Sequence, residues 1–212
     1  MKKSCVNRKA EERNTAFLNG TVDKLLAGNG YFVFREKEKD GQIRGIDLYL
    51  FPNGSDDILL VDEKAAVEYW DRDLETYSIE FFTSNNVKNQ GWFVNDISET
   101  THYLFLYPRS LTADMRDVYS LEGILVEKKK LKDYFRQHGI FGADDVKRLL
   151  DFKGMYSDGK KECYSQSGLK IVQSLNKKEM PINVLVPKKD LLKMAVDTVF
   201  FNDLEETTKE AM

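Results

Sequence analysis

Cysteine is scarce in this chain of 212 residues. Its two cysteines, Cys5 and Cys163, stand far apart, and neither belongs to a CxxC pair or to a Cys/His cluster. Disulfide frameworks and structural zinc sites need several such residues at short, regular spacings. The sequence therefore predicts neither, and we expect a protein of a reducing, cytoplasmic compartment.

Long apolar runs and an excess of basic charge are also missing. No stretch approaches the ~20 apolar residues that cross a bilayer, and no apolar segment follows the basic start of the chain as in a secretion signal. We therefore expect a soluble protein without a membrane partner. The formal net charge is −3, whereas proteins that hold duplex DNA through its phosphates are usually basic. This balance counts against tight, non-specific DNA binding, but it does not exclude a local basic face.

The chain does contain the pattern of a mixed α/β (α+β) fold. Leu18, Val22 and Leu25 recur at helical spacing and predict an N-terminal helix over residues 7–27, which a Gly-Asn-Gly sequence ends. Alternating or continuous apolar runs predict strands at residues 31–36, 43–51, 58–64, 77–83 and 103–107. A helix followed by a β-meander is typical of α/β and α+β domains, and we expect a central mixed sheet with flanking helices.

The second half of the chain holds a short internal repeat. Residues 125–131 (LVEKKKL) resemble residues 185–191 (LVPKKDL), and each segment predicts a strand that runs into the start of a helix. Two copies are too few for a repeat architecture. We expect a single domain over the whole chain, with a core in about residues 1–110 and a C-terminal elaboration, residues 111–212, that carries both strand-helix units.

The hairpin of the second and third predicted strands carries the most informative charges. Side chains alternate between the two faces of a strand, so Asp62 and Lys64 share one face while Glu63 points to the other. A hairpin centred on the Gly54–Ser55 bond places Asp47 directly opposite Asp62. A half-step shift in the pairing would separate these side chains, and the sequence leaves that alternative open.

Two aspartates that face each other across a strand pair repel, and a divalent cation relieves the repulsion. Mg²⁺ is typically held by one or two carboxylates together with water and phosphate oxygens, and Mn²⁺ suits similar oxygen ligands. A neighbouring lysine can orient a water molecule and stabilise charge on a phosphate. Asp47, Asp62 and Lys64 therefore suit metal-assisted phosphodiester hydrolysis. The plainer interpretation is a solvated strand end, but the apolar run before Asp62 and the matching Asp47 favour a site.

These residues resemble the PD-(D/E)xK nuclease superfamily, to which restriction endonucleases belong. Asp47 matches the first aspartate of the family pattern, and Asp62-Glu63-Lys64 matches its acid-x-lysine triplet. The resemblance implies a restriction endonuclease-like α-β-β-β-α-β core. It also implies that Asp47 and Asp62 bind Mg²⁺ (or Mn²⁺), joined by the backbone carbonyl of Glu63, and that Lys64 serves the nucleophile. Here the middle residue of the triplet is charged, whereas in the family it is more often apolar.

A further carboxylate is expected from one of two positions. Many members of the superfamily add a glutamate from the first helix, and Glu11 lies on the same stripe as Leu18 and Val22. An acid near a helix start also simply favours the helix dipole, so both interpretations of Glu11 stay open. Glu80 is the alternative, on a strand whose residues Ile79 and Phe81 point to the opposite face.

The sequence thus favours a Mg²⁺-dependent endonuclease-like enzyme that acts on DNA. The lysine runs at residues 128–130 and 188–189 are the expected contacts to the DNA backbone, although such runs are usually solvated helix starts. The alternative is a catalytically inactive protein of the same fold that binds nucleic acid or another protein. A homodimer is compatible with either hypothesis.

Overall fold

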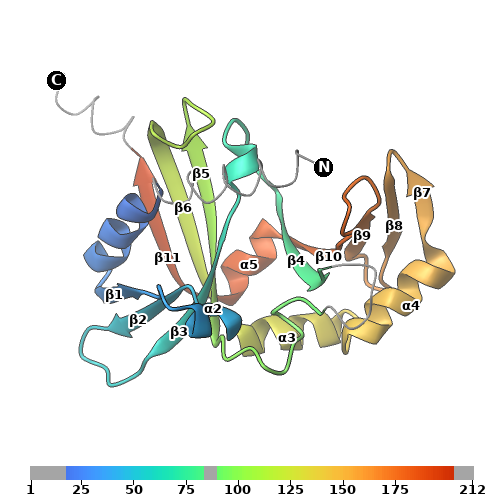
Figure 1. The fold of residues 1–212 in the computed structure, drawn as a ribbon, viewed down its shortest axis with the longest axis horizontal. Coiled ribbons are helices and arrows are strands. Elements are labelled where there is room, and N and C mark those ends of the chain that lie inside the picture. Colours follow the sequence, from blue (N-terminus) through green and yellow to red (C-terminus); the bar gives the residue numbers. More distant parts are fainter. Residues whose placement is uncertain (1–17, 84–89, 203–212) are drawn as a thin grey trace.

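The computed structural model describes residues 18–83 and 90–202, which form two β-sheets with helices packed around them (Figure 1). The first sheet is mixed and has the strand order β1-β2-β3-β5-β6-β11. Only β3 and β5 are parallel neighbours in it, and its other pairs are antiparallel. Its strands are β1 (Tyr31–Arg35), β2 (Leu48–Pro52), β3 (Leu59–Ala65), β5 (His102–Ser110), β6 (Val118–Glu127) and β11 (Ala195–Asn202).

The second sheet is antiparallel, with the strand order β4-β10-β9-β8-β7. Its first strand lies in the connection between β3 and β5, so the chain leaves the first sheet, adds a strand to the second and returns. The short 3₁₀ helix η1 (Val67–Tyr69) precedes that strand. The strands are β4 (Thr76–Phe82), β7 (Met155–Ser157), β8 (Lys160–Tyr164), β9 (Lys170–Ser174) and β10 (Ile182–Pro187).

Several predicted elements are confirmed. A helix occupies residues 18–28 and is followed by Gly30, which has a φ of +88° as expected at a helix stop. The part of the predicted helix before residue 18 lies outside the described residues. The strands β1, β2 and β3 form the predicted antiparallel meander, and the mixed α/β class is correct.

The start of β2 was predicted wrongly. The alternation of apolar residues indicated a strand from Ile43, but Lys39–Ile43 form the short helix α2 and β2 begins at Leu48. Gly41 lies against the side chain of Glu36, where a Cβ atom would collide with the carboxylate, and Gly45 has a φ of +77°. Glycine alone adopts such paths readily, so the chain makes a compact loop here.

The internal repeat forms the expected strand-helix units. β6 runs directly into α3 (Lys128–Gln137), and β10 runs directly into α5 (Lys188–Met194). The two strands belong to different sheets, and β11, the strand after α5, pairs with β6 at the edge of the first sheet. The C-terminal part of the chain therefore contributes to the same sheet as β1–β3.

Both faces of the first sheet are covered around β5, which explains why β5 is almost continuously apolar, whereas Phe32 and Phe34 of the edge strand β1 are exposed. One face packs on the helix at residues 18–28 through a buried cluster that includes Leu18, Val22, Leu26, Val61, Leu104 and Leu106. The other face packs on α3 and the second sheet through a larger cluster that includes Phe81, Phe93, Tyr103, Phe105, Ile124 and Phe135. α3 runs beneath both sheets, and α4 (Ala143–Lys153) lies along the second (Figure 1).

The connection between β3 and β5 differs from the expected pattern. Among the described residues between β3 and β5 there is no α-helix, whereas the α-β-β-β-α-β pattern places one there. β4 and η1 occupy that connection instead.

No helix in the described ranges has the length and apolar character required to cross a membrane.

Candidate metal and phosphodiester site

The hairpin register brings the two predicted aspartates together. β2 and β3 pair Leu48 with Val61, and continuing this register by one residue sets Asp47 opposite Asp62. This is the register expected for a turn centred between Gly54 and Ser55. The alternative half-step pairing does not occur, so Asp47, Asp62 and Lys64 share one side of the sheet.

Asp62 is buried at the centre of this group, with 2% of its surface exposed. Its Oδ1 lies 2.6 Å from Lys64 Nζ, while its Oδ2 is buried without a hydrogen-bond partner among the described residues. Burial raises the pKa of Asp62 to about 7, Lys64 opposes that rise, and the charge of the neighbouring Asp47 carboxylate adds to it. A buried polar atom without a partner is costly, so this carboxylate is suited to receive a ligand.

Asp47 is held by the backbone of the neighbouring strand β3. It lies in a bend just before β2, its N–H donates to the carbonyl of Val61 (2.9 Å), and its Oδ2 accepts from the N–H of Glu63 (2.8 Å). The Asp47 carboxylate thus accepts a hydrogen bond that a backbone carbonyl would accept if the pairing of β2 with β3 continued. These contacts fix the Asp47 carboxylate beside that of Asp62.

Lys64 stays charged in this setting. Burial lowers the pKa of Lys64, but the carboxylates of Asp62, Asp47 and Glu80 raise it by more, so the net shift is upward. The side chain keeps 39% of its surface exposed. Lys64 is therefore an accessible cation, suited to bind an anion beside the aspartates.

Glu80 reaches the same side from β4. Ile79 and Phe81 are buried in the large apolar cluster, as predicted, which leaves Glu80 on the opposite face of the strand. Burial raises the pKa of Glu80, and the charges of Lys64 and Lys177 oppose that rise. Glu80 therefore interacts with Lys64 rather than completing a three-carboxylate cluster.

Glu63 points to the other face of β3. Its carboxylate lies 3.1 Å from Arg35 Nη2, and the same guanidinium contacts Asp23 at 2.8 Å. Only 5% of the Glu63 side chain is exposed. The charged middle residue of the triplet therefore links β3 to β1 and to the helix at residues 18–28, and its side chain takes no part in the site. Glu11, the other predicted carboxylate, lies outside the described residues.

Sequence reasoning missed Tyr103. It pairs with Asp62 across β3 and β5, so it shares the face of the aspartates, and its hydroxyl is buried without a partner among the described residues. Burial raises the pKa of Tyr103, and the charges of Asp62 and Asp47 raise it further. Strand β5 was predicted, but its register beside β3 is a long-range feature that no local pattern revealed.

Lys128 was expected, with the rest of its lysine run, to contact the DNA backbone or to lie at a solvated helix start, but it is buried. It begins α3, is 8% exposed, and its Nζ donates to Ser98 Oγ (3.0 Å) and to the carbonyl of Trp92 (3.4 Å). Burial lowers the pKa of Lys128 to about 8, and the charge of Asp62 acts in the opposite direction. In the second run, Lys188 contacts Glu122 at 2.5 Å and lies over the ring of Tyr107.

No protein-family model, curated protein or solved structure matches this chain. The chemistry of the site therefore has to be judged from its own residues.

The carboxylates of this site could hold a divalent cation only if most of its ligands came from water and substrate, as Mg²⁺ accepts. Among the described residues no three His, Cys, Asp or Glu side chains gather as a metal-binding group. Mg²⁺ commonly uses one or two carboxylates and completes its shell with water and substrate phosphate. Asp47 and the unpartnered oxygen of Asp62 supply such a pair.

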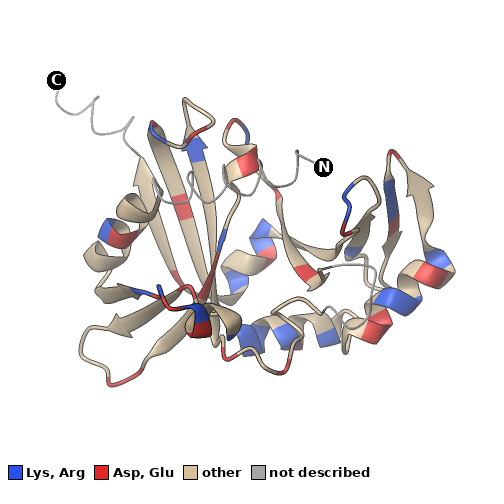
Figure 2. Cartoon of the chain, viewed as in Figure 1, with Lys and Arg blue, Asp and Glu red and all other residues tan. Residues whose placement is uncertain are grey.

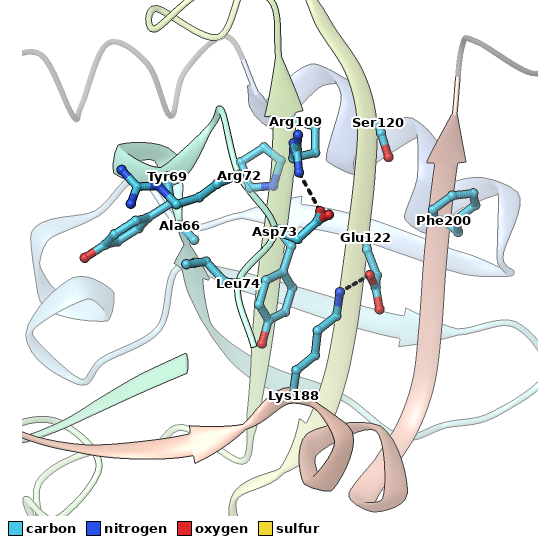
Figure 3. A pocket seen from close by; sticks show the side chains of 12 residues that line it. Ala66, Tyr69, Arg72, Asp73, Leu74, Arg109, Ser120, Glu122, Lys188 and Phe200 are labelled. Atoms are coloured by element: carbon cyan, nitrogen blue, oxygen red, sulfur yellow. Dashed lines mark hydrogen bonds and ion pairs between the residues drawn. The ribbon is translucent and has the colours of Figure 1, made fainter. Parts of the chain in front are cut away.

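Two cavities lie nearby, and neither is lined by Asp47 or Asp62. The larger, which we call the intersheet groove, has a volume of about 740 Å³ and extends from Lys64 and η1 to the second sheet. The smaller, of about 140 Å³, lies beside β5 and β6. Figure 3 shows that two ion pairs cross the smaller one, Arg109 with Asp73 (2.6 Å) and Lys188 with Glu122. Because its charges already pair with one another, we assign the site to the side that holds Lys64.

Proposed function

We propose that this protein is a Mg²⁺-dependent, endonuclease-like enzyme that hydrolyses phosphodiester bonds in DNA. One observation carries the proposal. Asp62 is buried against Asp47 and Lys64 with one carboxylate oxygen left unpartnered among the described residues. Two adjacent acids and an accessible ammonium group are the parts that metal-assisted hydrolysis requires.

Asp47 and Asp62 are the residues that would hold Mg²⁺ or Mn²⁺, with the backbone carbonyl of Glu63 as a further oxygen. The cation supplies Lewis acidity toward a phosphate oxygen and offsets the repulsion between the carboxylates. Asp47 is already oriented by its hydrogen bond from the N–H of Glu63. The geometry of the pair is therefore fixed by the strands and does not depend on a mobile side chain.

Lys64 acts as a cation and not as a base, because its raised pKa keeps it protonated at neutral pH. In hydrolysis, water forms a new P–O bond and releases a proton to solvent, while the bond to the leaving oxygen breaks and that oxygen takes up a proton from solvent. Negative charge grows on the phosphate as these bonds change. The ammonium group of Lys64 stabilises that charge and orients the water. Glu80 holds the ammonium group in place through its charge, which makes it a positioning residue.

The resemblance to the PD-(D/E)xK superfamily supports the same function. The order of the helix and the three-stranded meander agrees with the family pattern, as do the relative positions of Asp47, Asp62 and Lys64. The core departs from the pattern after β3, where β4 replaces the expected helix in the described connection. β4 nevertheless carries Glu80 to the site, so the substitution adds a charged group beside Lys64.

The proposal is tested with plasmid and branched DNA in the presence of Mg²⁺ or Mn²⁺. We expect metal-dependent cleavage that is lost in Asp62→Asn and in Lys64→Ala. Asp56→Asn makes the same chemical change at an exposed position of the same hairpin and should cleave normally. Thermal unfolding gives a second readout, since Mn²⁺ should raise the Tm of the unmodified protein and of Asp56→Asn but not of Asp62→Asn.

A catalytically inactive module of the same fold is the second candidate. The lack of a three-ligand metal group among the described residues favours it. Absence of cleavage together with an unchanged Tm in Mn²⁺ would contradict the enzyme and support this module. Cleavage that survives in Asp62→Asn would show that the nuclease activity does not belong to this site.

A further inference from the structure

The second sheet has one apolar and one polar face. Ile79, Val184 and Ile171 lie on neighbouring strands and are buried against the core. The residues between them along each strand face the intersheet groove, and several are small and polar: Thr76, Ser78, Ser174 and Asn183, joined by Asn176 from the turn after β9. Short polar side chains give the groove a floor that accepts hydrogen bonds and leaves room for a ligand.

Lysines border this floor on the side away from Lys64. Lys160 lies on β8, Lys170 on β9 and Lys177 in the turn before β10, and all three line the groove. Lys170 is paired with Glu162 at 2.7 Å, the charge of Lys177 acts on Glu80, and Lys160 has no ion pair with another described residue. Figure 2 shows basic residues on this part of the second sheet. The groove therefore offers positive charge to an anionic ligand.

The opposite wall has a different character. It is formed by the end of β3, by η1 and by Leu74, and Lys64 is the only lysine or arginine among the described residues that line it. Glu68 and Tyr69 of η1 also line this wall, and Tyr69 is 42% exposed. In Figure 3 the ring of Tyr69 is turned away from the pair of Lys188 and Glu122. The guanidinium of Arg72 lies over this ring, 5.6 Å from its centre. A partly exposed aromatic ring beside a cationic groove suits the stacking of an unpaired base.

We propose that the intersheet groove binds a single DNA strand and leads it to Lys64. The phosphates follow Lys160 and Lys177, and a base stacks on Tyr69. A duplex would bring a second charged backbone against the opposite wall, where Glu68 lies and where Lys64 is the one lysine or arginine among the described lining residues. This inference rests on the proposed nuclease function, for which it names the form of the substrate.

The binding test uses the full chain and labelled oligonucleotides in EDTA, so that it does not depend on cleavage. The variant Lys160→Gln/Lys177→Gln removes two of the lysine charges that line the groove. Its matched control is Lys132→Gln/Lys153→Gln, with exposed lysines on α3 and α4. Single-stranded DNA should bind more tightly than duplex DNA or single-stranded RNA of equal length.

Salt dependence gives the quantitative expectation. Each phosphate contact on a single strand contributes roughly 0.7 to the slope of log affinity against log salt. Loss of two contacts should therefore reduce the slope by about 1.4 and weaken binding at 0.1 M salt by roughly 25-fold. Tyr69→Leu should weaken binding at least about fivefold with an unchanged slope, because it removes stacking and no charge. The control variant should match the unmodified protein.

Each other outcome overturns the proposal. Preferential binding of duplex DNA or of RNA would assign a different substrate. Equal losses in the groove variant and its control would show that binding is non-specific. Failure of the nuclease proposal is recognised separately, since single-strand binding in EDTA with the predicted slopes can persist in a protein that cleaves nothing.

Discussion

At the scale of single residues, the ionisation of Asp62 makes the stability of the protein depend on pH. Its pKa of about 7 lies above the ordinary value of 3.8 because it is buried. Between these values the folded protein keeps a proton that the unfolded chain has released. The proton on Asp62 therefore contributes its full stabilisation of the folded state below about pH 4. This contribution is lost as the pH rises to about 7, and the free energy of unfolding falls by at most about 1.4 kcal/mol per pH unit.

Comparison with Asp62→Asn isolates this group, because asparagine does not titrate. The difference in free energy of unfolding between the unmodified protein and the variant should fall from pH 4 to pH 7 and level off above pH 7. Urea unfolding at several pH values measures it. Mn²⁺ binds only the ionised carboxylate, so its affinity should rise up to about tenfold per pH unit over the same range. A constant difference would show that Asp62 ionises like a surface aspartate.

At the scale of elements, Glu63 joins β3 to its neighbours. Its carboxylate and the guanidinium of Arg35 are largely buried, and Arg35 also contacts Asp23 on the helix at residues 18–28. Burial raises the pKa of Glu63, and the charge of Arg35 opposes that rise. Removal of one partner from a buried pair leaves an uncompensated charge, which costs about 3 kcal/mol or more.

We therefore expect Arg35→Met to lower the free energy of unfolding by about 3 kcal/mol, because it leaves the buried Glu63 carboxylate without its partner. Glu63→Leu should cost less, because Arg35 keeps its contact with Asp23. The double variant Arg35→Met/Glu63→Leu should recover most of that loss, because it removes both charges and keeps the volume filled. Chemical unfolding of the two single variants and the double variant completes the cycle. Additive losses would mean that the two side chains stabilise β3 independently.

Local sequence patterns predicted some of these elements correctly and missed others. The hairpin register followed from turn chemistry and strand alternation, so Asp47, Asp62 and Lys64 were brought together correctly. Alternation failed before β2, because the Glu36 side chain packs closely on Gly41 and Gly45 takes a positive φ, and both favour a compact loop. The placement of β4 in a second sheet and of Tyr103 beside Asp62 depends on contacts between distant segments. Such pairings leave no periodic signal in either strand, and sequence alone did not predict them.

At the scale of the whole molecule, one apolar cluster connects the two sheets. Phe135 of α3 lies between them, with ring centroids 5.2 Å from Phe81 of β4 and 5.2 Å from Phe93. Phe93 in turn contacts Tyr103 of the first sheet at 5.9 Å. Because these rings form a continuous core, the two sheets should unfold together, and the burial of Asp62 depends on both.

Phe135→Ala tests this coupling. Truncation of a buried phenylalanine costs about 3 to 5 kcal/mol, so the urea midpoint should fall strongly. Phe152→Ala is the matched control, since Phe152 on α4 is 84% exposed and its loss should change stability by less than about 0.5 kcal/mol. In both variants tryptophan fluorescence and far-ultraviolet circular dichroism should report one coincident transition. Separate transitions in Phe135→Ala would show that each sheet folds on its own, and the groove would then lie between two independent units.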